Sequence, residues 1–216
     1  MDKVLQFLKE LSQNNNREWF QKNKSWYDES REKVIFLTEV LINEIGKFDA
    51  SVRGLQAKDS MFRIFRDVRF SHDKRPYKTN FGSFICRGGR KSMNPGYYFH
   101  LEPTECFVAG GIYMPSAEPL RAIRNYLAGH AEEFIEITGD PDFKNNFPEM
   151  YEDKLKTAPK GFPKDHEYLE LLKYKSFIFS KTFNDREVKS DEYVENMVNA
   201  FRIVVPLNEF LYRALD

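Results

Sequence analysis

The sequence predicts an α+β fold, with a mostly antiparallel sheet in the middle of the chain flanked by N-terminal and C-terminal helices. Apolar residues recur at helical spacing in the first 48 residues and again after Pro115. Between these regions, short aromatic and β-branched runs are broken by Gly, Pro and Asn, which is typical of antiparallel strands. The 216 residues contain no internal repeat and no Gly/Ser linker, so a single domain is expected over residues 1–216.

The N-terminal part predicts three helices. Residues 4–11 have a short apolar stripe, and the asparagine cluster 14–16 ends this helix and can cap a second one that carries Trp19 and Phe20. The longest helix of this half is expected from Trp26 to Phe48, because its apolar residues follow a helical period.

Strands are predicted at residues 61–65, 81–87, 96–102 and 105–114. The first run also matches a helical stripe, since Met61, Ile64, Phe65 and Val68 have helical spacing. We favour a strand there.

Helices return in the C-terminal half. Pro119 is suited to the first turn of a helix for which Gly129 is the expected end or a kink, and residues 131–137 can continue it. A proline-rich connection then leads to a short helix at 167–173 and a strand at 176–183. A last helix should open at Ser190–Glu192 and break at Pro206.

Composition excludes several classes of protein. Hydrophobic residues make up 41% and charged residues 31%, so a real core is expected and intrinsic disorder is not. The 2 cysteines have no second Cys or His at metal-ligand spacing, which argues against a zinc site or a disulfide framework. No stretch is long and apolar enough for a membrane span. A soluble, cytoplasmic protein without a cofactor is the expectation.

Charge is balanced overall but unevenly distributed. Residues 63–91 contain nine Lys or Arg and two acids, whereas residues 92–216 contain fourteen Lys or Arg and twenty-one acids. These opposite charges can neutralise each other in the fold or can face separate ligands.

The basic stretch Phe62–Gly82 is the first candidate site. Clustered cations repel one another unless acids or a bound anion offset the repulsion, and Arg and Lys are the usual ligands of phosphate and carboxylate groups. The predicted ligand-binding residues are Arg63, Arg66, Arg69, His72, Lys74, Tyr77 and Lys78. The Gly88–Lys91 turn can extend this patch. The structural alternative pairs Arg66 with Asp67 or with an acid of the C-terminal half, and docks the loop on that acidic half.

A second candidate lies on the predicted strand at 96–102. Strand alternation places Tyr98, His100 and Glu102 on one face, where a histidine and a carboxylate could share a proton. The favoured interpretation is that these residues form the water-facing side of the sheet.

The run Arg-Asp-x-Arg-Phe-x-x-Asp-Lys-x-Pro-Tyr-Lys at 66–78, with the stretches 7–24, 96–103, 107–115 and 171–179, resembles a microbial and fungal family catalogued only as a domain of unknown function. Arg75 departs from the small uncharged residue that the family often has there. The resemblance implies a single-domain member and brings no established activity.

Three functions remain open. The first is binding of a small anionic or phosphorylated ligand near Arg63, Arg69, Lys74 and Lys78, with chemistry assisted by His72 or Asp73 undetermined. The second is nucleic-acid binding, with Tyr77 and exposed Phe residues as stacking platforms, which the zero net charge weakens. The third is a protein interaction module that uses the split between basic and acidic regions. No residue pattern decides whether the protein is an enzyme.

Overall fold

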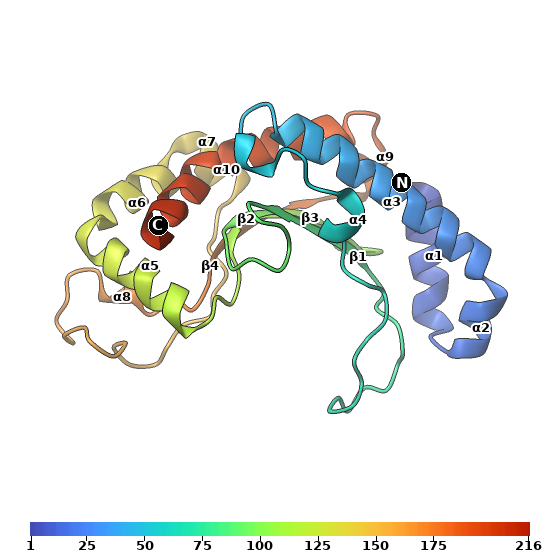
Figure 1. Cartoon of the computed structure of the whole chain (residues 1–216), viewed down its shortest axis with the longest axis horizontal. Helices are drawn as coiled ribbons and strands as arrows, with labels where there is room; N and C mark the ends of the chain where they lie inside the picture. Colours follow the sequence, from blue (N-terminus) through green and yellow to red (C-terminus); the bar gives the residue numbers. More distant parts are fainter.

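A four-stranded antiparallel sheet with helices on one face forms the protein, as seen in a computed structural model that describes all 216 residues (Figure 1). The strand order is β1-β2-β3-β4, with β1 at Phe81–Cys86, β2 at Gly96–Leu101, β3 at Cys106–Ile112 and β4 at Phe177–Phe183. The α+β class, and the placement of the sheet between N-terminal and C-terminal helices, are confirmed.

Helices precede β1, lie between β3 and β4, and follow β4 in sequence. They are α1 (Asp2–Gln13), α2 (Arg17–Lys22), α3 (Lys24–Ile45), the 3-10 turn η1 (Ala50–Val52), α4 (Ala57–Ser60), α5 (Ala117–Gly129), α6 (Ala131–Gly139), α7 (Pro141–Asn146), α8 (Leu169–Leu172), α9 (Asp185–Lys189) and α10 (Tyr193–Leu215). Asn16 caps α2 through a hydrogen bond that its side-chain oxygen accepts from the Trp19 N–H. None of these helices combines the length and the apolar character needed to cross a bilayer.

One face of the sheet is covered by helices. Phe99 of β2 is fully buried, and the ring of Tyr97 packs edge-on against Phe201 of α10, with 5.5 Å between ring centroids. Gly110 of β3 lies so close to α10 that a Cβ placed there would be 1.9 Å from a methyl carbon of Val204. This glycine therefore allows the long C-terminal helix to lie directly on the sheet.

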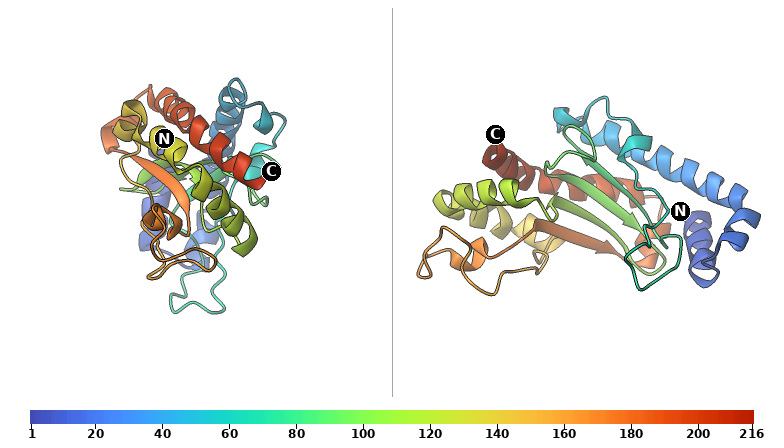
Figure 2. Two further views of the ribbon diagram at one scale, coloured as in Figure 1. Left: turned by 90° about the vertical axis from the view of Figure 1, so that its left-hand side faces the viewer. Right: turned by 60° about the horizontal axis from the view of Figure 1, so that its bottom comes forward.

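The other face of the sheet carries no helix. The right-hand view of Figure 2 looks onto this face, with the strands in front of α10. Register places Tyr98 beside Ala109 and His100 beside Phe107, all on this open face. Side chains here are mostly half-buried or exposed rather than packed into the core.

The prediction that Pro206 breaks the last helix is wrong, because α10 is continuous from Tyr193 to Leu215. Proline removes one backbone donor, which usually kinks or ends a helix. Here Pro206 is exposed, while Val204 and Leu207 on either side of it are buried. Apolar burial on both sides of the proline holds the helix together.

The predicted strand at 61–65 is also wrong. Met61 and Phe65 make only isolated bridges, to Ser83 and Tyr77 respectively. Residues 62–80 instead form a protruding hairpin-like arm, which we call the basic arm, and Figure 1 shows it projecting from the side of the sheet opposite α3 and α10. Its two limbs are joined by backbone bonds from Arg66 N to Pro76 O (2.9 Å) and from Lys78 N to Ile64 O (2.8 Å). These bonds join the two limbs to each other, and Phe62 N alone bonds to β1, at Gly82 O (2.9 Å), so the arm does not extend the sheet as a strand.

Candidate functional site

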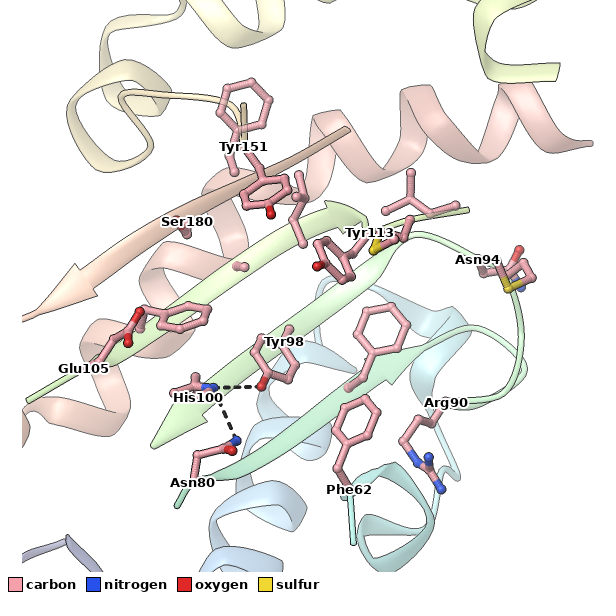
Figure 3. Close-up of a pocket in the computed structure, with 18 of the residues that line it drawn as sticks. Phe62, Asn80, Arg90, Asn94, Tyr98, His100, Glu105, Tyr113, Tyr151 and Ser180 are labelled. Atoms are coloured by element: carbon pink, nitrogen blue, oxygen red, sulfur yellow. Dashed lines mark hydrogen bonds between the residues drawn. The ribbon is translucent and has the colours of Figure 1, made fainter. Parts of the chain in front are cut away.

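A pocket of about 920 Å³ lies on the open face of the sheet (Figure 3). The strands supply its floor, the basic arm and the 87–95 loop form one wall, and residues near Tyr113 and Tyr151 form the other. Most of the lining is apolar or aromatic, notably Phe62, Phe84, Tyr98, Phe107, Ala109, Met93, Tyr113, Met114, Tyr151 and Ile178. Pockets of this size and character suit a small organic molecule.

Two cations stand at the edge of this pocket where the basic arm meets the 87–95 loop. Lys78 Nζ and the Arg90 guanidinium carbon lie 5.3 Å and 5.1 Å from the centre of the Phe62 ring. Arg90 donates a hydrogen bond from Nε to the backbone oxygen of Asp59 at 3.1 Å. Neither cation forms an ion pair, and Arg63, on the limb of the arm that faces Lys78, forms none either.

The environment of Lys78 disfavours its positive charge. Partial burial lowers the pKa of Lys78, and the nearby charges of Arg63 and Arg90 lower it further. Cations that repel one another and lack a carboxylate partner leave a positive potential at this end of the pocket. Glu105, the carboxylate in the lining, lies at the opposite end from Arg90 in Figure 3.

A chain of hydrogen bonds crosses the pocket floor along β2. Tyr98 Oη lies 2.9 Å from His100 Nδ1, and His100 Nε2 lies 3.0 Å from Glu102 Oε2. Thr79 donates to the other oxygen of Glu102, and Asn80 Nδ2 lies 3.4 Å from His100 Nδ1. The imidazole ring also stacks on Phe107, with 4.8 Å between centroids. Both ring nitrogens and both carboxylate oxygens therefore have partners.

The Tyr98 hydroxyl is held in its protonated form. Burial raises the pKa of Tyr98 to about 12, and the carboxylates of Glu102 and Glu105 contribute to the rise. Its ring fits because β1 has a glycine beside it: a Cβ on Gly82 would lie 2.5 Å from the Tyr98 hydroxyl oxygen. The small residue on β1 thus makes room for the side chain that contacts His100.

The tip of the basic arm differs from its base. Asp73 pairs with both Arg66 and Arg75 at 2.7 Å, and Asp67 pairs with Arg69 at 2.7 Å. The guanidinium of Arg75 strongly lowers the pKa of Asp73, and that of Arg69 lowers the pKa of Asp67. Most of the tip's guanidinium groups are therefore neutralised by acids of the arm itself.

The predicted ligand-binding residues are thus not brought together. Lys78 lines the pocket and Arg63 lies near it, whereas His72 is exposed at the tip and Lys74 donates to the backbone oxygen of Val68 at 3.1 Å. Tyr77 is buried and stacks on Phe20, with centroids 4.0 Å apart, so it offers no face to a ligand. Two hydrogen bonds between its backbone and the Asn15 side chain anchor the arm beside Lys78.

Partners that the sequence left open can now be assigned. Arg66 pairs with Asp73, and neither Asp67 nor an acid of the C-terminal half is its partner. Among the cations of residues 63–91, Arg87 alone pairs with an acid of the C-terminal half, namely Asp216 at 3.3 Å. The basic arm is not docked on the acidic half through ion pairs.

Strand alternation correctly placed Tyr98, His100 and Glu102 on one face, and Tyr98 and His100 line the floor of the pocket. The sequence did not indicate Asn80, Tyr113 or Tyr151 as pocket residues. Arg90, from the Gly88–Lys91 turn, does extend the cationic edge. No group of three or more His, Cys, Asp or Glu side chains is arranged to hold a metal ion.

Comparison with known proteins gives one match. A family model described as "Conserved hypothetical protein (DUF2461)" matches residues 3–210, which is nearly the whole chain. The searches of curated proteins and of solved structures gave no match.

Proposed function

Because the chain belongs to the conserved hypothetical protein family DUF2461, whose description names no activity, we propose a function from the site itself: binding of a small organic anion in the pocket on the open sheet face. The observation that carries the proposal is the pair of unpaired cations, Lys78 and Arg90, at one end of an aromatic pocket. The phosphate or carboxylate group of the ligand contacts these cations, and its apolar body lies on the sheet.

Charge energetics support an anionic ligand. Holding Lys78 near Arg63 and Arg90 destabilises the fold, and a bound phosphate or carboxylate offsets that repulsion. Arginine offers a fork of N–H donors to such a group, and lysine adds a point charge. At the tip of the arm, Asp67 and Asp73 already supply the negative charge that offsets repulsion between the neighbouring arginines.

The rest of the pocket supports an organic ligand over a bare inorganic ion. A free phosphate would fill only a small part of about 920 Å³. The ring of Phe62 lies against the cations and those of Phe84, Tyr98 and Phe107 add to the apolar lining, and burial of a ligand's ring or chain there adds about 25 cal/mol for each Å² removed from water.

Thermal unfolding with phenyl phosphate tests this proposal, with phenol and inorganic phosphate as partial ligands. A ligand that binds only the folded protein raises Tm, by roughly 5 °C at a hundred times Kd for a chain of this size. Phenyl phosphate should stabilise the protein more than either partial ligand. The double variant Lys78→Ala/Arg90→Ala should lose that response.

The matched control is Arg69→Ala/Lys74→Ala, which removes two cations from the tip and should keep the response. The proposal fails if no anion shifts Tm, or if the tip variant loses the response while the pocket variant keeps it. A short single-stranded oligonucleotide belongs in the same screen. Stabilisation by the oligonucleotide alone, lost in the tip variant, would favour nucleic-acid binding at the arm instead.

A further inference from the structure

We propose that Tyr98, His100 and Glu102 form a proton relay that acts on the ligand in this pocket, so that the site is catalytic. This inference rests on the proposed function, because the same pocket must hold the ligand. Tyr98 is the catalytic residue, whose oxygen meets the substrate. His100 and Glu102 act through it as positioning residues and as the reservoir for its proton.

Hydrogen-bond geometry assigns the roles of the two imidazole nitrogens. Glu102 Oε2 accepts from His100 Nε2 at 3.0 Å, so the proton of the neutral ring resides on Nε2. Nδ1 then carries the lone pair, and two donors converge on it, the Tyr98 hydroxyl at 2.9 Å and the Asn80 amide at 3.4 Å. Because the Tyr98 proton points at Nδ1, the lone pairs of its oxygen remain for a group in the pocket.

The order of groups matches what general-base catalysis requires. Stacking on Phe107 and the bond to Glu102 fix the ring of His100, whose side chain is only 14% exposed. Thr79 in turn fixes Glu102 through its second oxygen. A base whose orientation is already fixed in this way loses little orientational entropy when the transition state forms.

One proton transfer step follows from this arrangement. A substrate O–H or C–H bond breaks as its proton passes to Tyr98 Oη, while the original hydroxyl proton of Tyr98 passes to His100 Nδ1. The electron pair of the broken bond stays on the substrate, and the imidazolium that forms is stabilised by the Glu102 carboxylate. Tyrosine thus never becomes a free phenolate, which its pKa of about 12 would make costly.

The substrate class follows from what surrounds the relay. The Phe62 ring touches both regions, since its centroid lies 6.1 Å from that of Tyr98 and about as far from the two cations. A molecule of a few carbons can therefore reach both. We infer a phosphorylated or carboxylated metabolite that bears a hydroxyl group or an activated C–H bond a short distance from its anionic group.

Base-promoted ring opening of 5-nitrobenzisoxazole tests the relay without knowledge of the natural substrate. This neutral, planar probe loses its ring C–H proton to a base as its N–O bond breaks, and the nitrophenolate product is coloured. The wild-type protein should accelerate the reaction above buffer. Tyr98→Phe and His100→Gln should each lower kcat roughly tenfold or more, since a placed base contributes about 10²–10⁴-fold.

Glu102→Gln should lower kcat severalfold with little change in KM, because it affects proton acceptance and not probe binding. The matched control is Tyr126→Phe/His130→Gln, a stacked Tyr–His pair at the C-terminal end of α5 that does not line the pocket, with ring centroids 4.0 Å apart. It should behave as wild type. A wild-type rate equal to buffer overturns the proposal, and so does a Tyr98→Phe variant as fast as wild type.

Nitrogen NMR of histidine-labelled protein supplies a readout that does not depend on turnover. For His100 it should show a protonated Nε2 and an unprotonated Nδ1, and Tyr98→Phe should change the Nδ1 signal. A proton on Nδ1 would overturn the relay even if the variants had failed to fold. Stabilisation by phenyl phosphate is measured in a separate experiment. A protein without the relay can therefore still show anion binding, and a protein that binds no anion is identified by its unchanged Tm.

Discussion

The two faces of the sheet differ in how much of the fold depends on them. On the covered face, Tyr97, Phe99 and Val108 are almost completely buried beneath the helices. On the open face, the residues that alternate with them, such as Tyr98 and His100, are half-buried and form polar contacts. Stability is concentrated on one side of the strands, so the other side is free to carry binding groups.

The charged residues also divide into a group that supports the fold and a group that does not. Cations that pair within the arm, as at Asp73, contribute favourably or neutrally to the fold. Cations that border the pocket have no such partner, and the lowered pKa of Lys78 reflects the resulting repulsion. Residues that do not stabilise the fold and yet lie together at a pocket are typical of a functional site.

The largest expected effect is the loss of a ring from the covered face. Phe99→Ala removes a side chain that is 0% exposed, so the free energy of unfolding should fall by about 3–5 kcal/mol. Phe107→Ala, on the adjacent strand but on the open face, should cost roughly 1–2 kcal/mol because its ring is only half-buried. Urea unfolding of both variants measures the difference. Equal losses would mean that the open face is as important to stability as the covered one.

Much of this fold was predictable from the sequence, because alternation and helical periodicity record burial directly. The runs at 81–87, 96–102, 105–114 and 176–183 did become strands. Prediction failed where local pattern and tertiary context disagreed. Residues 61–65 have strand-like composition but make only two isolated bridges, from Met61 to Ser83 of β1 and from Phe65 to Tyr77 of the returning limb, and Pro206 lies in a helix that packing keeps intact.

The site was less predictable, because a cluster of cations in sequence does not reveal which of them find partners. Asp67 and Asp73 each pair with an arginine two residues away, but Asp73 also pairs with Arg66, seven residues away, and only the turn of the arm decides that pairing. Arg90 reaches the same pocket edge as Lys78 from a different loop. The histidine and carboxylate on β2 were visible by alternation, but the walls that turn that face into a pocket come from distant segments.

Replacing one glycine on each face of the sheet compares the two faces directly, and the larger of the two expected effects on stability is of intermediate size. Gly110→Ala places a methyl group 1.9 Å from Val204 in the packed interface with α10, which should destabilise the protein by about 1–3 kcal/mol. Gly82→Ala meets only the end of the Tyr98 side chain, which can move into the pocket, so Tm should change little. That movement should break the contact with His100 and remove the acceleration of benzisoxazole opening.

Measuring Tm and rate for both glycine variants separates the faces. A Gly82→Ala protein with full activity would show that Tyr98 does not need its present position. A Gly110→Ala protein with unchanged Tm would show that α10 can shift on the sheet at low cost. Either outcome would weaken the division between a structural face and a functional face.

The smallest expected effect has the opposite sign. Lys78→Met keeps an unbranched side chain against Phe62 and removes a partly buried charge near Arg63 and Arg90, so Tm at neutral pH should rise by about 1–2 °C while the response to phenyl phosphate is lost.

The folded-state pKa of Lys78 lies below its ordinary value, so its protonated form destabilises the fold at neutral pH. This penalty is relieved as pH rises through the folded-state pKa, and the Tm advantage of the variant should therefore shrink towards about pH 10. Lys74→Met at the exposed tip is the control and should show neither the rise nor its pH dependence. If Lys78→Met instead lowers Tm, the lysine stabilises the empty protein, and the repulsion argument for a bound anion is lost.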